Sequence, residues 1–142
     1  MFGGEAGHSV DLMALPSNVH CDFSGQPLLF FSPYPTPGCT CVNVFAQHPA
    51  SHSPSFFCNP YAFPPIALIP QLIFFLRSLT LPCTLIIPDV YLRRFWWSLL
   101  RATATQYCLL AHKGDPESLS ILYSKGFFPQ PRLPWDLSVL RI

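Results

Sequence analysis

The residue types best suited to contact nucleic acid lie together in one short segment. Arg93, Arg94 and Arg101 are interleaved with Trp96 and Trp97. Arginine can contact backbone phosphate and an indole ring can stack on an unpaired base, so Arg93, Arg94 and Trp97 are candidates for binding single strands. The alternative, favoured because only three charges are involved, is a helix with Trp96 in the core and its arginines in solvent.

Cys39, Cys41, His48 and His52 can be drawn as a metal site. Two thiolates separated by one residue fit poorly with the usual spacing of structural zinc pairs, and no second pair follows at zinc-ribbon distance. The sequence therefore predicts loop residues and no metal. Most of the six cysteines are expected to be reduced and buried, above all those inside apolar runs, Cys83 and Cys108.

Other catalytic machinery is not recognisable. The chain has no Gly-x-Ser-x-Gly elbow for a serine nucleophile, and its early glycines do not follow a strand or precede a lysine and a serine, as in a phosphate-binding loop. With seven acidic residues in all, pairs of carboxylates for acid–base catalysis are scarce. These observations weigh against a hydrolase of the serine or nucleotide type.

The composition describes an apolar chain with little charge. Its 142 residues suffice for one domain, which we expect to span residues 1–142. Half of the residues are hydrophobic and 11% are charged, so self-association is plausible. A net charge of +1 gives no basic field for collecting phosphate groups. The 17 prolines predict a loop-rich first half.

No segment has the form of a signal peptide or a membrane span. Residues 1–8 lack a basic patch followed by an apolar run, which favours an intracellular location, cytoplasmic or nuclear. The most apolar stretch, 62–76, is shorter than the roughly 18 residues that a span needs and contains three prolines. No membrane partner is therefore expected.

Apolar periodicity and turn residues predict an alternation of strands and helices. Expected strands are 9–14, 28–32, 41–46, 56–58, 83–87, 106–111 and an edge strand within 135–142; expected helices are 66–79 and 92–102, with a helical turn at 117–123. The segment 59–65 reads as a proline and aromatic turn. Strands joined by helices must run the same way. The expected fold is thus a small α/β domain, Rossmann-like, with a mainly parallel sheet and a proline-rich irregular insertion after the first strand.

A series of short phrases in a fixed order points to a family. They are Val10-Asp11-Leu12, Phe30-Phe31-Ser32, Val44-Phe45-Ala46-Gln47, Tyr61-Ala62-Phe63-Pro64-Pro65, Leu85-Ile86-Ile87-Pro88-Asp89 and Phe95-Trp96-Trp97. Over residues 9–100 the chain resembles the region that follows the reverse transcriptase and ribonuclease H in polyproteins of DIRS-like retroelements. That region is in turn similar to phage-type DNA adenine methyltransferases, which implies S-adenosylmethionine chemistry in the ancestry.

The resemblance also implies roles for particular residues. A carboxylate at a strand end can hold ribose hydroxyls, and Asp11 is the residue that matches this role. In the methylase turn Asn-Pro-Pro-Tyr, an amide accepts a hydrogen bond from the target amine and an aromatic ring stacks on the flipped base. Here the double proline is preceded by Phe63 and followed by Ile66, so both groups are missing. Asn59 and Tyr61 form a second candidate turn, with one proline missing.

A further departure from the retroelement pattern is Asn43, where related sequences carry an aspartate. Three hypotheses follow. The first is a non-catalytic remnant or accessory module of a retroelement polyprotein, with nucleic acid or the flanking polymerase portion as partner and no cofactor. The second is an S-adenosylmethionine-dependent DNA adenine methyltransferase with a degenerate site. The third is an unstable or spurious translation product.

Overall fold

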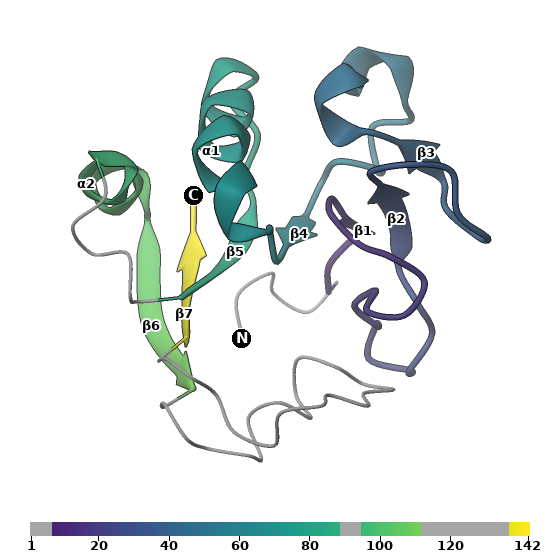
Figure 1. The fold of residues 1–142 in the computed structure, drawn as a ribbon, viewed down its shortest axis with the longest axis horizontal. Helices are drawn as coiled ribbons and strands as arrows, with labels where there is room; N and C mark the ends of the chain where they lie inside the picture. Colours follow the sequence, from purple (N-terminus) through teal and green to yellow (C-terminus); the bar gives the residue numbers. More distant parts are fainter. Residues whose placement is uncertain (1–6, 89–94, 112–136) are drawn as a thin grey trace.

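The computed structural model describes residues 7–88, 95–111 and 137–142 of the chain. In this part a seven-stranded sheet has the order β3-β2-β1-β4-β5-β7-β6 (Figure 1). The strands are β1 (Val10–Asp11), β2 (Leu29–Ser32), β3 (Cys41–Val42), β4 (Pro60–Ala62), β5 (Thr84–Pro88), β6 (Gln106–Ala111) and β7 (Leu137–Arg141). The α/β class and the mostly parallel sheet predicted from the sequence are confirmed.

The last strand is the exception to the parallel order. β1 pairs in parallel with β2 and β4, β2 with β3, and β4 with β5. β7 is antiparallel to both β5 and β6. The strand expected within 135–142 therefore exists, but its placement at the sheet edge is wrong. Leu137, Val139 and Leu140 are almost fully buried, and an interior position removes these apolar side chains from water.

In the described part of the chain two α-helices cover one face of the sheet, which we call the helix face. α1 (Ile69–Ser78) links β4 to β5, and α2 (Phe95–Thr103) precedes β6. Right-handed crossovers that advance in the same direction place their helices on the same side. The buried core forms between them and includes Val10, Leu12, Ala62, Leu72, Leu76, Leu85, Ile87, Trp96, Leu100 and Leu140.

The sequence pattern of α1 explains both its position and its ends. Ile69, Leu72, Ile73 and Leu76 are buried and recur at the three- and four-residue spacing of one helix face. Pro70 lies in the first turn, where its missing N–H costs no hydrogen bond. The helix predicted over 66–79 is confirmed, with its first three residues forming a 3-10 turn. Likewise β5, predicted as a buried central strand, is buried along its whole length.

The proline-rich first half departs most from expectation. Residues 56–58, predicted as a strand, form turns, and the strand is β4, inside the segment predicted as a turn. Pro60 is tolerated because it is the first residue of that strand. The strand expected at 41–46 ends after Val42, because Asn43 adopts a positive φ of 58° and caps a 3-10 turn. Sequence periodicity does not report such local turn chemistry.

The opposite face of the sheet, which we call the loop face, carries Asp11, Tyr61, Thr84 and Arg141. These side chains alternate with the core residues along their strands. Among the described residues no helix connects β1 to β2 or β2 to β3, and the segment 12–28 instead passes over this face. The irregular insertion expected after the first strand thus contains β2, β3 and short 3-10 turns.

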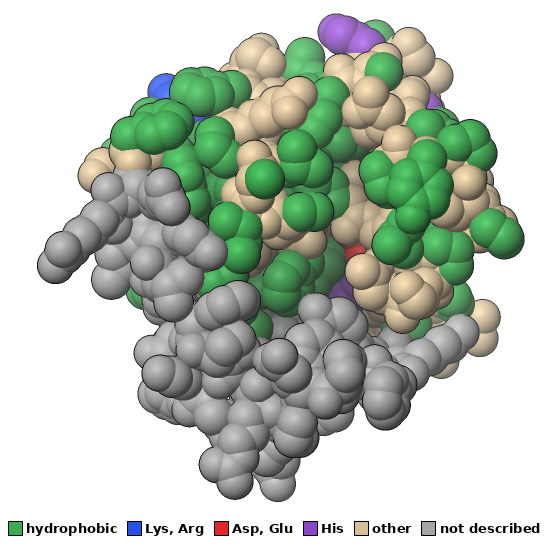
Figure 2. Space-filling model, in the orientation of Figure 1, with side chains coloured by type: hydrophobic (Ala, Val, Ile, Leu, Met, Phe, Trp, Pro, Cys, Tyr) green, Lys and Arg blue, Asp and Glu red, His purple; other side chains and the backbone are tan. Residues whose placement is uncertain are grey.

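Uncharged and apolar groups dominate the view in Figure 2. Phe23, Leu29, Phe74 and Phe95 are more than half exposed. All six cysteines are free thiols, but only Cys83 is buried, and Cys108, predicted to be buried, is exposed. Among the described strands β6 lies at the edge of the sheet, so within this part of the chain Cys108 lies on a strand that is paired on one side.

Candidate functional site

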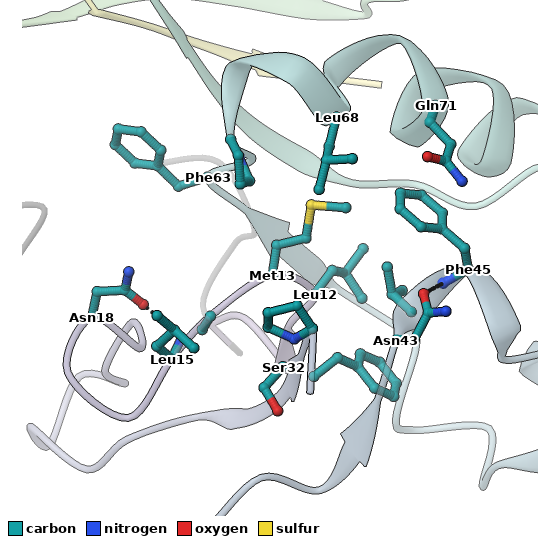
Figure 3. Close-up of a pocket in the computed structure, with 15 residues that line it drawn as sticks. Leu12, Met13, Leu15, Asn18, Ser32, Asn43, Phe45, Phe63, Leu68 and Gln71 are labelled. Atoms are coloured by element: carbon teal, nitrogen blue, oxygen red, sulfur yellow. Dashed lines mark hydrogen bonds between the residues drawn. The ribbon is translucent and has the colours of Figure 1, made fainter. Parts of the chain in front are cut away.

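A pocket of about 460 Å³ lies at the carboxyl ends of β1, β2 and β4, beside the start of α1 (Figure 3). Met13 and Leu15 come from the loop after β1, Pro33 from the loop after β2, and Phe63 and Pro65 from the turn after β4. β1 lies between β2 and β4, so the order of strands reverses at this point. Open α/β sheets bind ligands in the crevice at such a position.

The described residues that line the pocket carry no ionisable side chain. Apolar walls come from Leu12, Met13, Phe31, Phe45, Phe63 and Leu68. The polar groups are the side-chain amides of Asn18, Asn43 and Gln71 and the hydroxyl of Ser32. Figure 3 shows Asn18 on one side of the view and Asn43 and Gln71 on the other, with Met13 and Leu68 between them.

The amide oxygens in this pocket are partly engaged by the backbone. Asn18 Oδ1 accepts from the N–H of Leu15 at 2.8 Å, and Asn43 Oδ1 accepts from the N–H of Phe45 at 3.2 Å. Ser32 Oγ donates to the carbonyl of Tyr34 at 2.6 Å and so has its proton occupied. Backbone N–H groups therefore use part of the acceptor capacity of Asn18 and Asn43, and each of these amides keeps its N–H donors.

Asp11, the predicted ribose-binding residue, does not line this pocket. Its carboxylate is 2% exposed and accepts hydrogen bonds from the N–H groups of Met13 at 3.2 Å and His20 at 3.0 Å. Burial raises the pKa of Asp11 to about 7, although these two hydrogen bonds act in the opposite direction. Asp11 thus fastens the loop that forms one wall of the pocket, and its role with ribose stays a prediction.

Asn59 lies at the amino end of β4, whereas the pocket lies at the carboxyl end. Its Nδ2 donates to the carbonyl of Gly7 at 2.6 Å, and its Oδ1 accepts from Arg141 at 2.7 Å. Tyr61 is buried on the loop face, where its ring stacks on His20 with 4.2 Å between centroids. Neither residue is among those that line the pocket. Tyr61 instead lies opposite Asp11 in the paired strands β1 and β4.

Asn59 and Tyr61 instead belong to a polar cluster on the loop face. We define this cluster as His8, Asp11, His20, Asn59, Tyr61, Thr84 and Arg141. Arg141 also donates to Thr84 Oγ1 at 2.9 Å. The ring of His8 contacts those of His20 and Tyr61 at 5.6 and 5.3 Å between centroids. The pKa of His8 is lowered to about 4 by burial, with His20 and Arg141 adding repulsion. Burial lowers the pKa of His20 as well.

The basic and aromatic segment is only partly described, because Arg93 and Arg94 lie outside the described residues. Trp96 and Trp97 are 4% and 7% exposed and pack in the core, which leaves no indole face open for a base. The guanidinium of Arg101 lies over the ring of Tyr107 at 3.7 Å. The alternative expectation that Trp96 is a core residue is confirmed.

Within the part of the chain that the structure describes, no group of three or more histidines, cysteines or carboxylates is placed to hold a metal. His52 contacts the side chain of Gln47 at 3.2 Å and stacks on Phe56, so its ring is used in packing and hydrogen bonding within the loop. None of the described helices is long and apolar enough to cross a membrane.

The pocket residues were mostly missed at the sequence level. Asn18 stands in a polar turn after the first strand, and Gln71 is the polar residue in the first turn of an otherwise apolar helix. Such isolated amides carry no motif, so only the fold brings them together. Comparison of the chain with protein-family models, with curated proteins and with solved structures finds no match.

Proposed function

We propose that this chain is a non-catalytic module of a retroelement polyprotein, built on a Rossmann-like sheet of the methyltransferase type. The order 3-2-1-4-5 of its first five strands is that of doubly wound dinucleotide-binding sheets, with the same switch point beside β1. The antiparallel strand β7, which lies between β5 and β6, is similar in place and direction to a strand in the sheets of Rossmann-like methyltransferases. Both features support the proposed ancestry.

The observation that carries the proposed loss of catalysis is the turn after β4. Phe63 and Pro65 border the pocket, which supports the comparison of this turn with the methylase turn. A phenyl ring cannot accept a hydrogen bond from an exocyclic amine, and Ile66 has no ring to stack on a base. The two side chains that the chemistry requires are both replaced by hydrocarbon.

No other candidate restores these groups. Asn59 is held by Gly7 and Arg141 at the far end of β4. Tyr61 is 4% exposed beneath the loop that carries His20. The charged part of S-adenosylmethionine also finds no ionic partner among the described pocket residues. The residues present therefore do not fit this cofactor, and the proposed module uses none.

A methyl-transfer assay tests the loss of catalysis. Wild-type protein is incubated with radiolabelled S-adenosylmethionine and adenine-containing duplex and single-stranded DNA, beside an active adenine methylase as positive control. We expect no label in DNA above the level obtained with heat-denatured protein. Incorporation by the wild-type protein that is lost in Asn59→Ala would instead support the degenerate enzyme.

The polyprotein part of the proposal has a separate test. The flanking genomic DNA is expected to encode a reverse transcriptase and a ribonuclease H upstream, intact or decayed. A genomic region with no trace of either sequence would contradict it. The partners that we propose, the polymerase portion or nucleic acid, follow from that arrangement and not from the charge of the chain, which is only +1.

A further inference from the structure

The strand β6 is open to solvent along most of its length. It follows β7 at the edge of the described sheet (Figure 1). Every residue from Thr105 to Leu109 is exposed, and the apolar side chains of Tyr107 and Leu109 are 38% and 41% exposed. Successive residues of a strand point to opposite faces, so exposure along the whole run means that both faces of β6 are open at this edge.

The sequence of β6 lacks the features that keep an edge strand from pairing with another chain. Natural edge strands are protected by charged residues, prolines or short length. β6 has six residues, Gln-Tyr-Cys-Leu-Leu-Ala, without a charge or a proline. The strand at the other edge of the described sheet, β3, has only two residues. A register shift in β6 falls between Leu109 and Ala111, so the strand is regular up to Leu109.

The two faces of β6 carry different side chains. Tyr107 pairs with Leu140 of the core, and its ring lies under the guanidinium of Arg101 from α2, so Tyr107 is on the helix face. Leu109 follows two residues later and shares this face. Cys108 lies between them and therefore belongs to the loop face.

A second copy of the chain is the partner that fits this edge. Two identical edges join antiparallel about a twofold axis perpendicular to the sheet, and each copy then contributes the same surface. Directly opposite residues lie on the same face in such a pair, so the axis must pass through a residue and not between two residues. Because the strand carries no charge, the pairing brings no like charges of β6 opposite each other.

The apolar side chains select one register. With the axis at Cys108, Tyr107 of each copy lies opposite Leu109 of the other, so both partly exposed side chains gain an apolar neighbour. An axis at Tyr107 would place Leu109 opposite Thr105, and an axis at Leu109 would place Tyr107 opposite Ala111. The register at Cys108 therefore covers the most apolar surface.

We propose that β6 pairs antiparallel with β6 of a second copy, with the twofold axis at Cys108, and that the two sheets form one continuous sheet in a dimer. None of the residues that line the pocket belongs to β6. The proposal is therefore independent of the proposed loss of catalysis, and the methyl-transfer assay does not bear on it.

Sedimentation equilibrium of the full chain, over about a hundredfold range of concentration, tests the dimer. The wild type is expected to show a monomer–dimer equilibrium without larger species, because twofold pairing uses up both edges. Leu109→Lys places a charge in each of the two cross-strand pairs and should weaken dimerisation at least about tenfold. Phe74→Lys, which changes an exposed apolar residue of α1 in the same way, should dimerise like the wild type. Thermal unfolding checks that each variant is folded.

Cys108 provides a separate test of the register. Opposite residues in antiparallel strands have Cβ atoms about 4.5–5.5 Å apart, close to the span of a disulfide. Oxidation of the wild type with diamide is therefore expected to give a covalent dimer on a non-reducing gel. Cys108→Ser should prevent this cross-link, whereas Cys58→Ser, which removes another exposed thiol, should leave it unchanged.

Three results would overturn the proposal. The first is a wild type that stays monomeric or forms open-ended aggregates. The second is a dimer that Leu109→Lys weakens no more than Phe74→Lys does. The third is a cross-link that survives in Cys108→Ser, because the two chains would then meet at another surface.

Discussion

The two faces of the sheet solve the problem of burial in different ways. On the helix face, α1 and α2 cover Leu85, Ile87 and Leu140 with hydrocarbon. On the loop face, segments without helices cover Asp11, Tyr61 and Arg141, and hydrogen bonds and ring contacts link them. The first face depends on the amount of apolar area buried, whereas the second depends on each polar group finding its partner. Mutations on the helix face should therefore destabilise the protein through lost apolar burial, and mutations on the loop face through polar groups left without partners.

The largest effect is expected on the helix face. Leu85→Ala removes a fully buried side chain from β5 and should lower the free energy of unfolding by about 2–5 kcal/mol, because it leaves a cavity in a packed core. Chemical denaturation measures the loss. Phe74→Ala on the half-exposed side of α1 is the matched control and should cost less, on the order of 1 kcal/mol, because about half of this side chain is exposed. Equal losses in both variants would mean that this core is not formed.

Replacement of Arg141 on the loop face is expected to lower the free energy of unfolding by a smaller amount. Arg141→Met keeps much of the side-chain volume but removes the donors to Asn59 Oδ1 and Thr84 Oγ1. Leaving buried acceptors without these donors should cost about 1–3 kcal/mol in unfolding free energy. Arg101→Met, which loses only a contact over the exposed ring of Tyr107, should cost about 0.5–1 kcal/mol. If Arg141→Met left the free energy of unfolding unchanged, the claim that polar pairing stabilises the loop face would be wrong.

The loop face should also make stability depend on pH, because Asp11 acts in one direction and His8, together with His20, acts in the other. The pKa of Asp11 is raised to about 7 by burial, so its contribution is present at acidic pH and is lost as pH rises toward 7. The pKa of His8 is lowered to about 4, so its contribution is present above pH 6.5 and is lost as pH falls toward 4. In the wild type these two slopes partly cancel.

Variants separate the two slopes. Asp11→Asn removes the carboxyl titration, and unfolding free energy should then rise steadily between pH 4 and 6.5. His8→Phe keeps a ring against Tyr61 but removes one imidazole that opposes Asp11, so stability should change between pH 4 and 7 in the direction set by Asp11, downward relative to the wild type as pH rises. Thermal unfolding at several pH values measures both. If the slope of Asp11→Asn matched that of the wild type, the carboxyl would not be titrating in this interval.

The smallest effect is a difference in thiol reactivity between exposed and buried positions. Cys58 and Cys108 are exposed and should react with a thiol reagent in the native protein. Cys83 is buried and burial raises its pKa, so its thiol should react only after unfolding. Counting modified cysteines by mass spectrometry before and after denaturation checks this order. Early modification of Cys83 would show that the helix face opens readily.

The same contrast explains how much was predictable from sequence. The helix face is made of elements with clear apolar periodicity, and 66–79, 83–87 and 106–111 were predicted with the right type. On the other half of the sheet, strands of two to four residues are too short to show a period. Their placement depends on pairing with distant strands, which no local pattern records. The interior position of β7 was missed for the same reason.

The candidate site divides in a similar way. The resemblance points to Asp11 as a strand-end carboxylate. Its hydrogen bonds with the N–H groups of Met13 and His20 depend on the path of the loop, which no local pattern records. The residue types of Asn59 and Tyr61 suggest a catalytic turn over 59–65. In the structure β4 begins at Pro60, inside that segment, so Asn59 lies at the amino end of the strand and away from the pocket. The amides that do line the pocket come from three separate segments.

The most direct test of the central claim is a calorimetric titration of S-adenosylmethionine into the wild-type protein and into Asp11→Ala, with thermal unfolding of both samples. A folded module without cofactor chemistry predicts a cooperative transition for the wild type and no saturable cofactor binding at millimolar concentration. Saturable binding by the wild type would contradict this claim, and its loss in a folded Asp11→Ala variant would also support the role of Asp11 in a methyltransferase. The absence of any cooperative transition would contradict the claim that the module is folded and would favour an unstable translation product.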